Sequence, residues 1–182
     1  MLRYVTVLLA LLFALPASAT DAGWAALREG GHVVLLRHAF ISGNTEPANF
    51  DIEKCNTQRN LSERGRQQAR KLGALFGARA ARIEKVLSSR YCRSLDTARI
   101  AFGSQPEIFD ALNQLSEDPD ERSQQKQAVL EIIRNFSGSE LLVLVSHLEN
   151  IQEITGVSPR EGEAVIVAPQ DEGVRVLGRV VF

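Results

Sequence analysis

Five side chains suited to phosphoryl chemistry stand at the ends of, or soon after, short stretches of sequence that are typical of buried strands. They are Arg37, His38, Arg90, Arg93 and His147. An arginine guanidinium is a planar fork of N–H donors that fits phosphate oxygens. An imidazole beside it can attack phosphorus or donate a hydrogen bond to a phosphoryl group. If the fold brings these residues together, they can bind and transfer a phosphoryl group without a metal ion.

The pattern of apolar residues predicts how these side chains are positioned. Short apolar runs, typical of strands, occur at residues 32–37, 85–88, 107–112, 141–145, 164–168 and 174–182. Segments with helical signals separate most of them, at residues 62–77, 90–102, 118–136 and 148–156. This alternation predicts an α/β fold, a three-layer α/β/α sandwich with a central, mostly parallel sheet. Ligands of such sheets bind beyond the carboxyl ends of the strands, where His38 and His147 are expected to meet.

Each of these residues also has a purely structural interpretation. A histidine at the end of a strand often only packs, and an arginine at the start of a helix is often a solvated charge. His32, which opens the first strand at the opposite edge of the sheet, fits that plainer interpretation. The convergence of several such residues from distant parts of the chain is what favours a functional site.

The charge and the composition exclude several classes of protein. The chain has 182 residues, with 21 basic and 22 acidic side chains and a formal net charge of −1. This balance argues against a general nucleic-acid binder. Two cysteines and three histidines, without a closely spaced cysteine pair, give poor support for a structural zinc site. We therefore expect neither a metal nor a cofactor.

The N-terminus has the pattern of a secretory signal peptide over residues 1–19. Arg3 provides a positive charge, residues 5–15 form an apolar core, and Ala17-Ser18-Ala19 is a small-residue cleavage site. We expect cleavage after Ala19, which leaves residues 20–182 as a single periplasmic or secreted domain with no stable membrane insertion. An uncleaved anchor is the alternative, but the apolar core is about half of the roughly 20 residues that span a bilayer.

Export changes the interpretation of the two cysteines. Cys55 and Cys92 are the only cysteines in the chain, and an oxidising compartment permits a disulfide between them. Cys55 belongs to the loop-like segment after His38, and Cys92 directly precedes Arg93. Both segments are expected near the same edge of the sheet. Two separate buried thiols are the alternative.

Four segments of the chain resemble, in the same order, the motifs of the histidine phosphatase superfamily, which includes the cofactor-dependent phosphoglycerate mutases. Residues 36–39 resemble an Arg-His-Gly signature, and residues 60–69 resemble Leu-(Ser/Thr)-x-x-Gly-x-x-Gln-Ala. Residues 88–98 are similar to Ser-x-x-x-x-Arg-Ala-x-x-Thr-Ala, and residues 145–151 to Val-(Ser/Thr)-His-Gly-x-x-Ile. The match extends from about residue 32 to residue 168 and implies a phosphoglycerate mutase-like fold.

The resemblance also implies roles for individual residues. His38 is expected to be the nucleophile that becomes transiently phosphorylated, while Arg37, Arg93 and His147 hold the phosphoryl oxygens. The candidate substrate contacts are Asn44, Arg59 and Arg90. Arg59 belongs to a segment, residues 51–60, that is similar to exported bacterial histidine phosphatases. A surface position for Arg59 or Arg90 is the alternative.

The chain departs from the family pattern at the proton donor. A leaving alkoxide needs a general acid, and mutase-like members often have a glutamate where this chain has Gln114. Glu149 is the first substitute, because His147-Leu-Glu149 resembles the His-Ala-Glu triplet of related inositol-polyphosphate phosphatases. Its alternative role is that of a charge at a helix N-terminus. Asp118 and Glu117 are further candidates, although Asp118 also has the sequence context of a helix cap.

These observations predict an exported phosphomonoesterase that acts on a phosphorylated small molecule or glycan through a phosphohistidine at His38. Two alternatives stay open. A phosphohistidine phosphatase releases an imidazole and needs less help from an acid, and a catalytically weak protein could bind a phosphate or phosphosugar. We expect no nucleic-acid partner, and the oligomeric state is not readable from the sequence.

Overall fold

The computed structural model describes residues 19–103 and 105–182. The predicted signal peptide lies outside these residues, apart from Ala19. None of the helices in these two ranges combines the length and the apolar character that crossing a bilayer requires.

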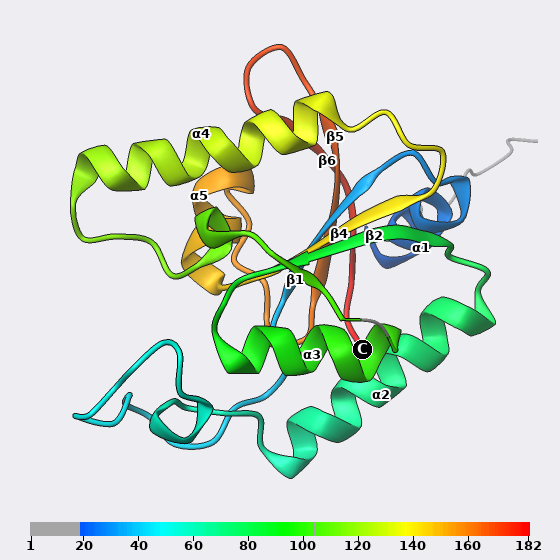
Figure 1. Cartoon of the computed structure of the whole chain (residues 1–182). Coiled ribbons are helices and arrows are strands. Elements are labelled where there is room, and N and C mark those ends of the chain that lie inside the picture. The colour runs from blue at the N-terminus through cyan, green and yellow to red at the C-terminus, as the bar shows by residue number, and fades with distance from the viewer. Residues whose placement is uncertain (1–18, 104) are drawn as a thin grey trace, which may run out of the picture.

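A six-stranded sheet forms the centre of the molecule (Figure 1), with the strand order β3-β2-β4-β1-β5-β6. In chain order the strands are β1 (Val33–Arg37), β2 (Ile83–Ser88), β3 (Glu107–Ile108), β4 (Leu141–Ser146), β5 (Ala164–Pro169) and β6 (Val174–Val180). The first four are mutually parallel, whereas β5 pairs antiparallel with both β1 and β6. A hairpin of four residues joins β5 to β6, and so short a connection permits only antiparallel pairing. The prediction of a mostly parallel sheet is confirmed.

Helices cover both faces of the sheet. They are α1 (Ala19–Glu29), α2 (Glu63–Ala78), α3 (Cys92–Phe102), α4 (Pro119–Asn135) and α5 (Leu148–Thr155), with two short 3₁₀ turns, η1 (Cys55–Thr57) and η2 (Asp110–Leu112). Helices α1, α2 and α3 pack on one face, and α4 and α5 pack on the other (Figure 1). The predicted three-layer sandwich is therefore confirmed. Helix α1 is not among the predicted elements, and the run at 107–112 divides into β3 and η2.

Each central strand contributes side chains to the hydrophobic cores on both faces of the sheet, because successive side chains of a strand point to opposite faces. In β1, Val34 and Leu36 pack toward α1 and α2, while Val33 and Leu35 pack toward α4 and α5. All six residues of β4 are buried. Each fully buried side chain of this size contributes roughly 1.5–3 kcal/mol, so burial of these central strands contributes strongly to the stability of the fold.

Helices α2 and α3 lie side by side (Figure 1), and their backbones come into close contact at Gly73. A Cβ atom at this position would collide with the backbone carbonyl of Ala101 in α3. At Gly77, one turn further along α2, a Cβ atom would meet no heavy atom within 4 Å. Gly73 and Gly77, one turn apart in the same helix, therefore stand in opposite environments.

We predict that Gly73→Ala lowers the free energy of unfolding by about 1–3 kcal/mol, because the added methyl group overpacks a backbone contact. Gly77→Ala is the matched control and should leave stability unchanged or raise it by up to about 1 kcal/mol, since alanine favours helix. Urea denaturation of the two variants and the wild type measures both effects. Equal stability of the two variants would contradict the close approach of α2 and α3.

Candidate active site

Parallel pairing of β1 with β4 brings the two predicted histidines together. The last register pair is Arg37 with Ser146, so His38 and His147 each follow at the next position. The backbone N–H of His38 donates to the carbonyl of Ser146 at 3.1 Å. The two imidazole rings lie 5.4 Å apart between centroids, and only 4% of His38 and 1% of His147 is exposed.

The His38 ring is held in the form that a nucleophile needs. Its Nδ1 lies 2.9 Å from the carbonyl oxygen of Ala39. A carbonyl only accepts, so Nδ1 carries the proton and Nε2 keeps its lone pair. Burial lowers the pKa of His38 to about 3, and the nearby guanidinium groups of Arg93 and Arg37 lower it as well. His38 is therefore neutral at physiological pH.

His147 is oriented by a neighbouring hydroxyl group. Its Nε2 lies 2.8 Å from Ser89 Oγ, while its Nδ1 is buried and has no hydrogen-bond partner among the described residues. Burial holds the pKa of His147 well below its ordinary value, and the charges of Arg93 and Arg37 act in the same direction. A buried polar nitrogen without a partner is costly, so Nδ1 is the atom of His147 that a polar ligand can satisfy.

Arg93 lies at the start of α3 with only 2% of its surface exposed. Its Nη1 donates to Oε1 of Glu46 at 2.7 Å, and its guanidinium carbon lies 4.3 Å from the centroid of the Tyr91 ring. Its Nε has no hydrogen-bond partner in the described ranges. Burial lowers the pKa of Arg93, and Glu46 opposes that shift.

Two further arginines complete a cationic pocket. Arg37 donates from Nη1 to the carbonyl of Pro159 at 3.0 Å, and Arg59 donates from Nη2 to the carbonyl of Gly43 at 2.5 Å. The pocket has a volume of about 310 Å³ and is lined by Arg37, His38, Ile41, Arg59, Arg93, Gln114, His147, Leu148, Glu149 and Glu161. Three guanidinium groups beside two neutral imidazoles suit an oxyanion such as a phosphoryl group.

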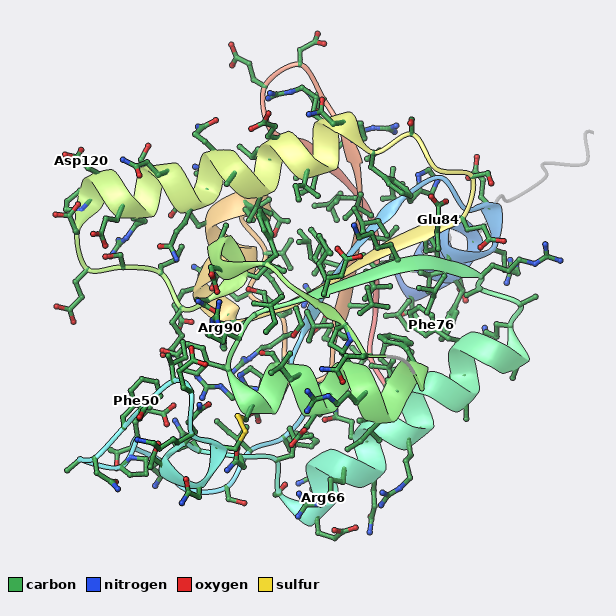
Figure 2. All side chains as sticks on the ribbon, in the orientation of Figure 1. Phe50, Arg66, Phe76, Glu84, Arg90 and Asp120 are labelled. Atoms are coloured by element: carbon green, nitrogen blue, oxygen red, sulfur yellow. A yellow bond between two sulfur atoms is a disulfide. The ribbon has the colours of Figure 1, made fainter. Side chains whose placement is uncertain are left out.

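The structure places four predicted candidates outside this pocket. Arg90 (labelled in Figure 2) forms a bidentate pair with Asp110, with both N···O distances 2.9 Å. Asp118 caps α4 by accepting the backbone N–H groups of its first turn, and Glu117 precedes it. Asn44 is exposed on the loop after β1. None of the four is among the residues that line the described pocket.

Two carboxylates near the site were not singled out by the sequence. Glu161 lines the pocket from the turn before β5, and Glu46 bonds to Arg93 from the loop after β1. Both lie in irregular segments without apolar periodicity, so no sequence signal distinguished them from solvated surface charges. Glu149, at the first turn of α5, lines the pocket as well and is exposed. Gln114 also lines the pocket, but its amide cannot donate a proton as a general acid.

The described residues contain no group of three or more histidine, cysteine or carboxylate side chains arranged to hold a metal ion.

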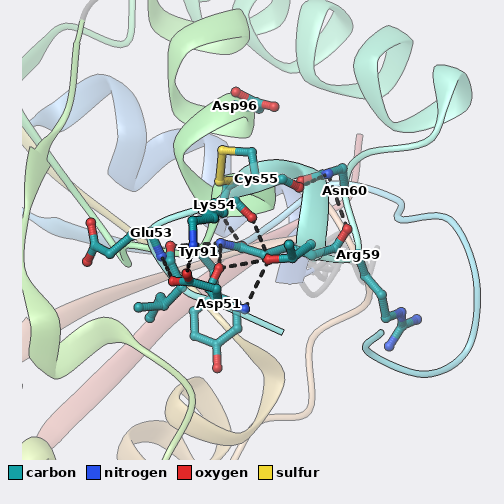
Figure 3. Close-up of a disulfide and its surroundings, with 12 residues drawn as sticks. Asp51, Glu53, Lys54, Cys55, Arg59, Asn60, Tyr91 and Asp96 are labelled. Atoms are coloured by element: carbon teal, nitrogen blue, oxygen red, sulfur yellow. Dashed lines mark hydrogen bonds and ion pairs between the residues drawn. A yellow bond between two sulfur atoms is a disulfide. The ribbon is translucent and has the colours of Figure 1, made fainter. Parts of the chain in front are cut away.

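The loop between β1 and α2 is tied to the start of α3 (Figure 3). The expected disulfide joins Cys55 to Cys92, whose Cα atoms are 5.6 Å apart. Beside it, Gln58 Oε1 accepts the backbone N–H of Cys92 at 2.9 Å. Phe50 stacks on Tyr91 with ring centroids 5.5 Å apart. The same loop supplies Arg59 to the pocket, so these contacts fix Arg59 relative to Arg93, the residue after Cys92.

We predict that loss of the disulfide lowers the free energy of unfolding by up to about 4 kcal/mol, because the bond closes a loop with a sequence separation of 37. Urea denaturation with and without a reductant measures the effect. The Cys55→Ser/Cys92→Ser variant is the control and should not respond to the reductant. Mass spectrometry of unreduced, alkylated protein that finds two alkylated cysteines would refute the bond.

We also predict that the folded protein loses stability as the pH falls from about 6.5 toward 3. The pKa of His38 is lowered to about 3, so in this window the unfolded chain binds a proton that folded His38 does not. The slope for this one group is at most about 1.4 kcal/mol per pH unit. Chemical denaturation of wild type and His38→Ala between pH 7 and pH 4 isolates the contribution.

His32→Ala is the control for the pH experiment, because His32 lies at the opposite end of β1. It should keep the wild-type pH dependence, whereas His38→Ala should flatten it. The same slope in wild type and His38→Ala would mean that His38 titrates normally in the folded protein.

Comparison with known proteins agrees with this geometry. The family model of the histidine phosphatase superfamily (branch 1) matches residues 33–118. A search of curated proteins finds no match. The fold is similar to that of the putative phosphohistidine phosphatase SixA from Agrobacterium tumefaciens, with a TM-score of 0.60 and 18% identity over 83% of this chain and 97% of that chain.

Two other solved structures share the fold at similar distances. A putative alpha-ribazole-5'-P phosphatase from Escherichia coli has a TM-score of 0.61 and 18% identity over 81% of this chain and 95% of that chain. The mycobacterial glucosyl-3-phosphoglycerate phosphatase in complex with VO3 has a TM-score of 0.61 and 16% identity over 82% and 99%. The family-model match over residues 33–118, the shared fold and the two histidines at one rim all agree with the pattern of the histidine phosphatase superfamily (branch 1).

Proposed function

We propose that this chain is an exported phosphomonoesterase that hydrolyses a phosphorylated small molecule or glycan through a phosphohistidine at His38. The observation that carries the proposal is the neutral, buried His38 beside Arg37, Arg59 and Arg93 in one pocket. Two structures with the same fold hold phosphate-like oxyanions. One is a further SixA structure, of a protein histidine phosphatase complexed with tungstate, and the other is the mycobacterial phosphatase with VO3. These complexes support an oxyanion as the ligand.

In the first step, Nε2 of His38 attacks the phosphorus atom and the bond from phosphorus to the leaving oxygen breaks. The guanidinium groups of Arg37 and Arg93 stabilise the charge on the phosphoryl oxygens, as preorganised donors do in a site closed to water. Ser89 Oγ donates its one proton to Asn113 Oδ1 at 3.1 Å, so Nε2 of His147 donates to Ser89 Oγ. Nδ1 of His147 donates to the phosphoryl group only when the ring takes up a second proton. The leaving oxygen takes a proton from a general acid and departs as an alcohol.

In the second step, a water molecule attacks the phosphorus atom of phosphohistidine and restores His38 with release of inorganic phosphate. The acid that served the leaving group then acts as the base for water. We assign this role to Glu149, because its carboxylate lines the pocket and has no hydrogen-bond partner among the described residues. Glu161 lines the same pocket and is the competing assignment.

A second hollow offers space for the group that is attached to the phosphate, which favours a phosphorylated small molecule as the substrate. It has a volume of about 500 Å³ and is lined by Leu115, Arg122, Glu149, Gln152, Glu153 and Gly156. It adjoins the phosphoryl pocket, since Glu149 borders both and the consecutive residues Gln114 and Leu115 line one each. Its mixture of charged and amide side chains suits a group that carries hydroxyls, such as a sugar.

A phosphohistidine phosphatase is the second candidate, and Gln114 is the observation that favours it. An imidazole leaves more readily than an alkoxide. Dephosphorylation of phosphohistidine therefore does not require a proton-donating carboxylic acid at position 114. A substrate panel distinguishes the two functions. Faster turnover of sugar phosphates than of phosphohistidine supports the monoesterase, and the reverse order supports the alternative.

We predict that His38→Ala abolishes turnover of phosphomonoesters, because it removes the nucleophile that divides one difficult displacement into two easier ones. Rapid-quench labelling of the wild type should capture an acid-labile, alkali-stable phosphoprotein that His38→Ala does not form. Arg93→Ala should also reduce turnover strongly, whereas Arg90→Ala, outside the pocket, is the control and should have a small effect.

Near-wild-type turnover in a folded His38→Ala protein would overturn the mechanism. Binding of phosphate without any labelling or turnover in the wild type would point instead to a phosphate- or phosphosugar-binding protein.

A further inference from the structure

Glu46 is a carboxylate bonded directly to the arginine that is expected to bind phosphate. Its Oε1 accepts from Arg93 Nη1 at 2.7 Å, and its Oε2 accepts the backbone N–H of Arg59 at 2.8 Å. Its side chain is 27% exposed, while that of Arg93 is 2% exposed. One carboxylate thus connects two arginines of the phosphoryl pocket.

The geometry argues against Glu46 as a proton donor. Both of its oxygens are engaged as acceptors, and it is not among the residues that line the pocket. Its contacts instead balance charge. Without Glu46, the buried guanidinium of Arg93 would have no carboxylate partner and would stay close to Arg37 and Arg59, an arrangement that is costly when the pocket holds no anion.

The same carboxylate opposes the binding of a second anion. A phosphate that reaches Arg93 either meets the negative charge of Glu46 or displaces it from its two hydrogen bonds, and both outcomes cost free energy. Displacement is resisted by the loop, because the Cys55–Cys92 disulfide and the Phe50–Tyr91 stack hold it against α3.

We propose that Glu46 is a resident counter-ion of Arg93 that weakens the binding of inorganic phosphate and so favours release of the product. The inference rests on the proposed function, in which Arg93 holds the phosphoryl group. Glu46 acts through Arg93 and is therefore a positioning and charge-balancing residue, not a catalytic one.

The test is the affinity for inorganic phosphate and vanadate in Glu46→Gln. This variant keeps an oxygen acceptor for Arg93 Nη1 but removes the negative charge. Calorimetry should find both anions bound about tenfold more tightly than in the wild type, which corresponds to about 1.4 kcal/mol. Product inhibition by phosphate should tighten by a similar factor. Without phosphate the variant should melt at a lower temperature, and phosphate should raise its Tm more than that of the wild type.

Glu53→Gln is the matched control. Glu53 lies in the same loop and pairs with Arg90 at 3.2 Å outside the pocket, so this variant makes the same change in net charge. Its phosphate affinity should stay within twofold of the wild type. Glu46→Ala carries the same prediction as Glu46→Gln and replaces it if the glutamine variant does not fold.

Unchanged or weaker phosphate binding in Glu46→Gln would overturn the inference, since weaker binding would mean that Glu46 only orients Arg93. Equal tightening in Glu53→Gln would also overturn it, because the effect would then come from net charge. Failure of the proposed function has a different signature: the wild type itself would neither bind phosphate nor hydrolyse a phosphomonoester.

Discussion

The candidate site depends on the parallel register of β1 with β4. These two central strands are buried by helices on both faces and end level with each other, at Arg37 and Ser146. Because side chains alternate between faces, a slip of one residue would turn every side chain of β1 to the opposite layer. Such a slip would disrupt the hydrophobic cores on both faces of the sheet. The hydrophobic packing that stabilises the fold therefore also fixes the distance between His38 and His147.

Burial at this rim has opposite consequences for the histidines and for the arginines. An imidazole responds to burial and to neighbouring positive charge by losing its proton, which leaves His38 neutral with a free lone pair. A guanidinium keeps its proton and must instead find partners. Arg37 finds a backbone carbonyl, and Arg93 finds Glu46 and the face of Tyr91. The same environment therefore produces a neutral nucleophile and fixed cations.

The loop between β1 and α2 has no strand or α-helix to stabilise it, yet it supplies Arg59 and Glu46 to the site. Hydrogen bonds within the loop, such as those of Thr57 and Gln58 with Asp51, hold its shape. The disulfide, the Phe50–Tyr91 stack and the hydrogen bond from Cys92 to Gln58 fix it against the start of α3. These contacts lie within a few residues of Arg93. The chain thereby couples the position of its most buried arginine to that of an otherwise irregular segment.

Local patterns in the sequence specify the elements that carry the chemistry. Apolar runs locate β1 and β4 to within a residue or two, and local signals such as the cap at Ser62 and the left-handed Gly156 mark the ends of helices. Because a strand and the residue that follows it are local features, the sequence also indicated that His38 and His147 share one edge. The motif around Arg93 added the arginine whose importance local pattern alone could not distinguish from that of Arg90.

Which of the remaining polar residues reach the pocket depends on how distant segments pack together. Arg90 and Arg93 are three residues apart at the start of α3, yet one pairs with Asp110 outside the pocket and the other is buried within it. Glu46 lies on an irregular loop, and its contact with Arg93 joins residues separated by 47 positions. No local periodicity encodes such a contact, because it depends on where distant segments meet. The sequence therefore specified the scaffold and its histidines, and three-dimensional packing selected their charged neighbours.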